Sequence, residues 1–193
     1  MYIKYWDYFL SIESDLENCS RYVDICENNF ETYSIEFAKI IMIAASEIDS
    51  VCKEFCKLID PTKKPDRIKK YADIILSKYP NIIEMEIVLP NYNISRRPFE
   101  NWSNTSSPNW WKNNTDIKHN RTEYFYKANL VNSIDSVGGL LILLLYYYFH
   151  NNGCKKLDID FGQIPKIINL GNSDSPIQMY PGRVVWNYNL RIS

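Results

Sequence analysis

The sequence has little of what most metal and cofactor sites are built from. Its 193 residues include two histidines, six glycines and five cysteines. It has no Gly-rich phosphate-binding loop, and no second Cys pair at zinc-finger spacing accompanies Cys52 and Cys56. Reduced, buried thiols on helix faces are the favoured interpretation of the cysteines. We therefore expect no metal and no cofactor, with a zinc site that joins these two thiols to His119 kept as an alternative.

Long apolar stretches are also scarce. The longest runs from Val137 to Phe149, 13 residues, which falls short of the roughly 18 residues that span a bilayer. It predicts a buried core helix and no membrane association. The first residues, Met1 to Lys4, lead directly into an amphipathic pattern without the features of a secretory signal. We therefore expect a cytoplasmic protein.

Charge is balanced overall but unevenly distributed along the chain. The formal net charge is −1, yet residues 1–60 carry 5 Lys/Arg against 12 Asp/Glu. Residues 61–80 carry 6 against 2, and residues 91–127 carry 6 against 3. A basic middle is compatible with an anionic partner. Ordinary solvation of opposite surfaces would produce the same weak imbalance.

Apolar residues at alternating steps of three and four predict several helices. Two long ones are expected at about 2–28 and 34–59, a pairing that favours an antiparallel hairpin. A shorter helix is expected between Ile68 and Tyr79. A last long helix is expected from an N-cap at Ser107-Pro108 to His150, ended by Asn151-Asn152-Gly153.

Alternating, β-branched segments predict a small β component. Glu84 to Leu89 reads as a short strand, and residues 154–193 hold two more alternating pieces around a turn at Tyr180-Pro181-Gly182. The fold class is therefore mainly α: an antiparallel helical bundle with a small antiparallel β appendage from the C-terminal tail. Residues 1–153 would form the bundle, with a Trp-rich loop at 91–110. Residues 154–193 would pack on it as a β-rich tail, pairing with the strand near residue 87.

The Trp-rich loop and the residues after it combine aromatic and basic side chains. Such a combination can stack nucleobases beside phosphate contacts, although tryptophan is more often part of a core or a lid. The candidate nucleic-acid-binding residues are Trp110, Trp111, Lys112, Arg96 and Arg97.

His119 is the candidate centre of any chemistry. On a helix, Lys118 lies beside it and Asn114 lies two turns from Arg121. Such a cluster can hold a phosphate while the imidazole moves a proton. An exposed polar turn at the start of the last helix is the alternative. The other histidine, His150, is expected to favour the negative end of its helix.

Two carboxylates on the second helix form a further candidate site. Glu47 lies beside apolar residues near the helix seam, so we expect it to have a cationic partner, which the cluster around His119 would supply. Asp49 precedes Lys53 by one turn. A metal-dependent enzyme that uses Glu47, Asp49 and His119 stays an alternative without convincing ligand spacing.

The run Ser107-Pro108-Asn109-Trp110-Trp111, followed by Ile117-Lys118-His119-Asn120-Arg121, resembles a family of uncharacterised bacterial and mobile-element proteins. That family pairs Pro-x-Trp-Trp with Lys-His-x-Arg, and the similarity spans roughly residues 5–150. More loosely, the arrangement resembles the HEPN superfamily, helical bundles found in RNA-cleaving toxins and phage-defence proteins. That resemblance implies a metal-independent ribonuclease that acts as a homodimer. The chain departs from its pattern, because no arginine stands four to six residues before His119.

Two hypotheses follow. In the first, a HEPN-like protein binds or cleaves RNA, with His119 as general acid or base, Lys118 and Arg121 stabilising the phosphorane, and Asn114 and Glu47 orienting the groups. In the second, the same bundle is a non-catalytic module that binds a protein partner or regulates a mobile element.

Overall fold

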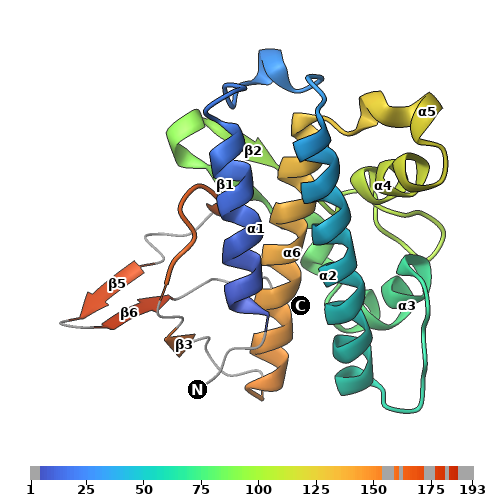
Figure 1. Ribbon diagram of the computed structural model, residues 1–193. Helices are drawn as coiled ribbons and strands as arrows, with labels where there is room; N and C mark the ends of the chain where they lie inside the picture. Colours follow the sequence, from blue (N-terminus) through green and yellow to red (C-terminus); the bar gives the residue numbers. More distant parts are fainter. Residues whose placement is uncertain (1–4, 154–158, 161–162, 172–176, 181–182, 187–193) are drawn as a thin grey trace.

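Three helices form the centre of the protein. The computed structural model describes residues 5–153, 159–160, 163–171, 177–180 and 183–186. Helices α1 (Trp6–Cys19), α2 (Ile35–Ile59) and α6 (Leu130–Asn151) lie side by side, and α1 runs opposite to the other two (Figure 1). The predicted mainly helical class and the helical hairpin of α1 and α2 are therefore confirmed.

Helix α6 is the core around which the other elements pack. Every residue from Asn132 to Phe149 is buried, so this helix contacts protein on all sides. By length and composition it would be able to cross a membrane, but nearly all of its apolar surface is buried inside the fold. The predicted core helix at Val137 to Phe149 is thus confirmed.

Two consecutive glycines let other elements approach α6 closely. A Cβ at Gly138 would overlap the side chain of Ile87, and one at Gly139 would lie 3.2 Å from Phe99 and 3.3 Å from Trp110. Because glycine has no side chain, a strand and the 97–111 segment pack directly on the helix backbone. This close packing fixes the segment that carries Arg96 and Arg97.

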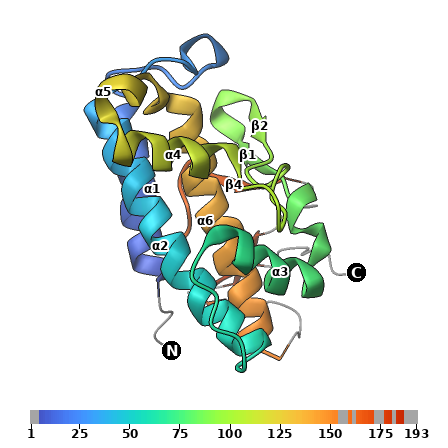
Figure 2. The same cartoon turned by 90° about the vertical axis from the view of Figure 1, so that its right-hand side faces the viewer.

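Shorter helices cover the remaining sides of α2 and α6. Helix α3 (Ile68–Lys78) packs on α2, and α4 (Asn109–His119) lies across α2 and α6 (Figure 2). The short α5 (Arg121–Tyr124) joins α4 to a 3-10 turn before α6. The 3-10 turns are η1 (Glu27–Asn29), η2 (Pro80–Glu84), η3 (Pro90–Tyr92) and η4 (Phe125–Lys127).

Two small antiparallel sheets complete the described chain. Strand β1 (Ile87–Leu89) pairs with β2 (Ile94–Arg96) on one side and β4 (Asn169–Leu170) on the other. The register sets Ile87 opposite Leu170, so the predicted pairing of the tail with this strand is confirmed. In the second sheet, β6 lies between β3 and β5; its strands are β3 (Ile159–Asp160), β5 (Ile177–Tyr180) and β6 (Arg183–Trp186). The predicted turn at Pro181-Gly182 lies outside the described residues.

Helix ends followed the prediction where a local cap decides them. Helix α2 begins after Ser34, whose hydroxyl accepts a hydrogen bond from the Phe37 amide at 3.0 Å. Helix α6 ends before Gly153, which adopts a left-handed φ of 70°.

Two predicted helices are shorter than expected. The first ends at Cys19, because the Ser20 hydroxyl bonds to the Glu17 carbonyl and the chain turns there. The predicted last helix is broken after His119. The short α5 and the turn η4 follow, and the long helix begins only with α6, where the Asn129 side chain accepts a hydrogen bond from the Asn132 amide. Ser107 is not the cap of α4, whose N-cap is Pro108.

Candidate functional site

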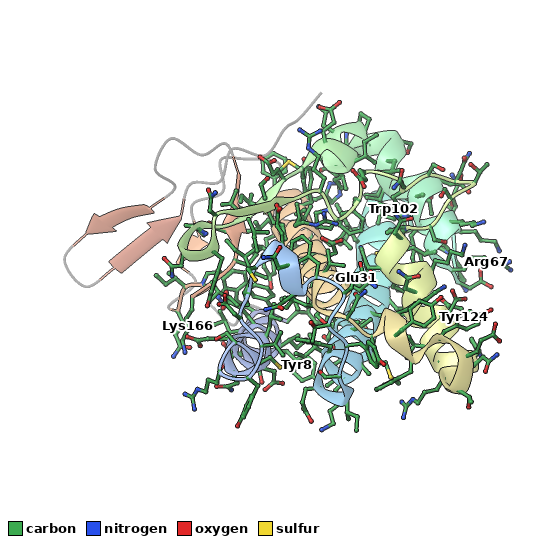
Figure 3. The ribbon with its side chains drawn as sticks, turned by 90° about the horizontal axis from the view of Figure 1, so that it is seen from above. Tyr8, Glu31, Arg67, Trp102, Tyr124 and Lys166 are labelled. Atoms are coloured by element: carbon green, nitrogen blue, oxygen red, sulfur yellow. The ribbon has the colours of Figure 1, made fainter. Side chains whose placement is uncertain are left out.

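A polar cavity lies at the N-terminal end of α6. It has a volume of about 390 Å³ and is bounded by the 96–101 segment, the first turn of α4 and the start of α6. Glu31, in the segment before α2, closes one side of the cavity. Figure 3 labels Glu31 in a view from the N-terminal end of α6. We call this cavity the amide pocket, since five asparagines line it: Asn101, Asn109, Asn113, Asn129 and Asn132.

The floor of the amide pocket is buried and fully hydrogen-bonded. Asn129 and Asn132 are 4% and 6% exposed. The Asn132 amide nitrogen donates to the Lys127 carbonyl at 2.9 Å, and its oxygen accepts from Asn113 at 3.2 Å. Asn129 donates to Glu31 at 3.0 Å. Because each of these groups has a partner, the floor is a rigid polar surface and costs little to desolvate further.

An ion pair anchors the same floor. The Arg96 guanidinium donates from Nε to Oδ1 of Asp135 at 2.9 Å and from Nη2 to Oδ2 at 2.8 Å. Burial raises the pKa of the Asp135 carboxyl above its usual value, and the two bonds from Arg96 offset part of that effect. The Asp135 carboxylate in turn raises the pKa of Arg96. The pair fixes strand β2 to helix α6, and the charge of Arg96 is compensated by Asp135.

The mouth of the amide pocket carries two cations that have no such partner. Arg97 and Lys112 are exposed and form no ion pair with any residue that the structure describes. A third cation, Lys127, is neutralised by Asp116 at 2.6 Å. Tyr126, 51% exposed, adds an aromatic ring to the lining. The mouth can therefore offer two charge-assisted contacts and one stacking surface.

The structure brings four of the predicted nucleic-acid-binding residues to this pocket and changes the role of one. Arg96, Arg97, Lys112 and Trp110 all line it. Trp110, however, is 1% exposed and its indole nitrogen donates to the Pro98 carbonyl at 2.9 Å. Stacking of a base on Trp110 is therefore excluded, because its faces are covered by the core. Trp111 lies half-buried on the other side of α4, away from the pocket.

Several residues of the pocket were not among the predicted ones. Asn129, Asn132, Asp135 and Tyr126 carry its floor and aromatic edge. The sequence held one signal for them: Asn132 and Asp135 are polar residues at helical spacing in a segment that otherwise reads as apolar. Buried polar side chains of this kind need partners, and those partners define the pocket.

The predicted catalytic cluster does not converge on one cavity. His119 is exposed in the last turn of α4 and forms no hydrogen bond with the described residues. Arg121 contacts the Met42 sulfur at 4.0 Å. Lys118 and Asn114 line a separate cavity of about 450 Å³ between α4 and α2, where the Asn114 side-chain oxygen is buried without a hydrogen-bond partner. The other predicted catalytic residues therefore do not surround His119, and none of the described residues orients its imidazole by a hydrogen bond.

The expected pairing of Glu47 with that cluster is not formed. Met42, Ala45 and Asp49 face α4, whereas Glu47 follows Ile43 by one turn on the side of α2 that faces α1. Glu47 forms no ion pair with the described residues, and burial raises the pKa of its carboxyl. The predicted pairing failed because the packing of α4 on α2, and not the charges around His119, decides which face of α2 those residues meet.

The other predicted polar residues have structural partners. Asp49 binds Lys53 at 2.6 Å and accepts from the Tyr71 hydroxyl at 2.7 Å. Nδ1 of His150 lies 2.7 Å from the Tyr79 hydroxyl, so this histidine belongs to an aromatic cluster. Among the described residues, no group of three His, Cys, Asp or Glu side chains could hold a metal ion. The metal-dependent alternative therefore has no ligand set in this part of the chain.

Fold and site define a mainly helical protein with an amide-rich pocket at the end of its core helix. Comparison of the chain with family models, with curated proteins and with solved structures found no match.

Proposed function

We propose that this protein binds single-stranded RNA and holds one nucleotide in the amide pocket. One observation carries the proposal: Arg97 and Lys112 stand without ion-pair partners at the mouth of a cavity whose floor consists of buried, satisfied amides and an ion pair. Exposed cations at the mouth suit an anionic group of a ligand, and a polar floor suits a flat ring with polar edges. A nucleotide has both.

The dimensions and chemistry of the pocket support a single nucleotide. Its volume of about 390 Å³ lies in the range of small-ligand sites, roughly 300–1,000 Å³. Sequence-specific proteins usually recognise RNA through unstacked single-stranded bases that insert into pockets and stack on aromatic rings. The exposed carboxamides of Asn101 and Asn109 would meet the base edge, since those of the floor already have partners. Tyr126 would stack on the base, and Arg97 and Lys112 would contact phosphates.

Binding without cleavage is the version that the geometry supports better. A metal-independent nuclease needs a base or acid within hydrogen-bond reach of the ribose, beside groups that stabilise the phosphorane. His119 lies outside the lining of the amide pocket and has no orienting partner among the described residues. A HEPN-like bundle that acts as a homodimer remains part of this proposal, and the mass of the protein in solution tests the dimer.

The proposal is tested by fluorescence anisotropy with labelled single-stranded RNA oligonucleotides in EDTA, at several salt concentrations. For single strands, the logarithm of the binding constant falls with the logarithm of the salt concentration, and each phosphate contact adds about 0.7 to the steepness of that slope. Because Arg97→Ala/Lys112→Ala removes two such contacts, the slope should become shallower by roughly 1.4. Tyr126→Ala should weaken binding by about 1–3 kcal/mol.

A matched control removes two cations elsewhere. Lys64 and Lys69 are exposed, unpaired among the described residues and far along the chain from the pocket. Lys64→Ala/Lys69→Ala therefore makes the same change in net charge and should leave the slope unchanged. Equal losses in the two double variants would show diffuse charge attraction and reject the amide pocket as the binding site.

A further inference from the structure

A groove between α1 and α2, on a different face from the amide pocket, has no assigned role. Figure 1 shows the two helices side by side, with this face toward the viewer. The groove has a volume of about 680 Å³, and Ile40, Ile43, Cys19 and Tyr22 supply its apolar lining. Ile40 is buried and forms the floor, whereas Tyr22 is 89% exposed. An aromatic ring this exposed beside an apolar floor is a feature of binding surfaces.

The residues along the groove follow a helical repeat on both walls. On α2 the stripe continues from the groove along the same face, at steps of four and three, as Glu36, Ile40, Ile43, Glu47, Ser50 and Glu54. On the other wall, α1 contributes Tyr8, Ile12, Asp15 and Cys19 at the same spacing, and Tyr22 follows in the turn after the helix. Figure 3 labels Tyr8, which is 50% exposed. The two stripes leave an apolar strip flanked by acidic side chains.

The acidic side chains along this face are mostly uncompensated. Asp15 lines the groove and forms no ion pair with any described residue, whereas Glu36 is neutralised at 2.7 Å by Lys39, which also lines the groove. Glu47 and Glu54, which continue the α2 stripe beyond the groove, form no ion pair with the described residues either. Residues 1–60, which build both walls, carry 5 Lys/Arg against 12 Asp/Glu. Half-buried carboxylates without a partner are unfavourable, which is why burial raises the pKa of Glu47. A cationic partner would remove that cost.

We propose that this acidic groove binds a basic amphipathic helix of a partner protein. An amphipathic helix inserts apolar residues at i, i+3, i+4 and i+7 into such grooves, which matches the spacing of the two walls. Lysine or arginine on the flanks of that helix would reach Asp15 and Glu47, while its apolar face covers Ile43 and Tyr22. The acidic walls disfavour an anionic helix and any nucleic acid. The inference stands independently of RNA binding at the amide pocket.

The test uses a synthetic helical peptide of leucine and lysine, about five turns long, with leucines at i, i+3, i+4 and i+7. A peptide with the same leucines and glutamate in place of lysine is the first control. Binding is followed by anisotropy, and circular dichroism confirms that each variant is folded. Asp15→Asn/Glu47→Gln and Tyr22→Ala should each weaken binding of the lysine peptide roughly tenfold.

A charge-matched variant distinguishes the groove from general attraction. Asp7 and Asp73 are exposed, lie outside the groove and form no ion pair with the described residues. Asp7→Asn/Asp73→Asn should leave the affinity of the lysine peptide unchanged. Absence of binding, equal binding of the glutamate peptide, or equal losses in the two double variants would overturn the proposal. So would a dimer that Tyr22→Ala splits into monomers, since a second copy would then cover the groove.

Discussion

Arg96 and Asp135 are 39 positions apart in sequence and form a two-bond ion pair, at 2.9 and 2.8 Å, that ties strand β2 to helix α6. The Asp135 side chain is 9% exposed, while that of Arg96 is 32% exposed. The carboxylate therefore depends on the guanidinium for its charge compensation, whereas the guanidinium still reaches solvent. This asymmetry determines what each substitution does to the amide pocket.

Removal of Arg96 should destabilise the protein more than removal of both partners. Arg96→Leu leaves the buried Asp135 carboxylate unpaired, and we expect the free energy of unfolding to fall by about 3 kcal/mol. Adding Asp135→Asn should restore part of that loss, because a neutral amide costs less to bury. Urea unfolding at neutral pH measures both effects. Strictly additive losses in the two single variants and the double variant would contradict the pairing.

Glu13 should hold residues 166–168 against α1. Its carboxylate is buried and accepts the backbone N–H groups of Lys166, Ile167 and Ile168 at 2.9, 2.9 and 3.0 Å. Glu13→Ala leaves three donors without a partner, so we expect a loss of about 3 kcal/mol in the free energy of unfolding. Glu13→Gln should recover some of it.

The matched control for Glu13 is its neighbour Glu17. Glu17 forms an ion pair with Lys166 at 2.8 Å, but the Lys166 side chain is 63% exposed. Solvent-exposed pairs contribute about 1 kcal/mol or less, so Glu17→Ala should have a small effect. Similar losses for the two alanine variants would show that the segment is held by general charge and not by the three N–H bonds.

The buried thiols should make the protein sensitive to alkaline pH. Burial raises the pKa of Cys56 from its usual value near 9 to about 12, and that of Cys52 also lies well above 9. A raised thiol pKa favours the folded state below pH 9, and this contribution is lost as the pH rises from 9 toward 12 because only the unfolded thiols ionise freely. Native Cys52 and Cys56 should therefore resist alkylation at pH 8 and react after denaturation, as mass spectrometry would show. Rapid alkylation of either thiol in the native protein would contradict their burial.

His119 provides the test between binding and catalysis. If the pocket binds RNA without cleaving it, total RNA and tRNA should stay intact in EDTA with both the unmodified protein and His119→Ala, at equal concentrations of folded protein. The affinity for RNA should also be the same for both, because His119 does not line the amide pocket. Cleavage that survives EDTA and disappears in His119→Ala would instead establish a metal-independent ribonuclease.

The sequence by itself determined the elements whose signals are local. Ser34 caps α2, the apolar run at Val137 to Phe149 is the core helix, and the alternation near Ile87 is a strand. Each of these rests on a repeat or a cap within a few residues, so it survives whatever the rest of the chain does. The sequence also indicated that Arg96, Arg97 and Lys112 lie near one another, because they are close together in the chain.

The tertiary structure alone decided which faces are covered and by what. Periodicity shows that Trp110 and Glu47 lie on helices, but only the position of α4 across α2 and α6 buries Trp110 and leaves Glu47 outside the face of α2 that α4 covers. Contacts such as Arg96 with Asp135, or Glu13 with residues 166–168, join segments far apart in the chain. Their partners are set by the packing of whole elements, because a buried polar group accepts any donor that the packed fold brings within reach.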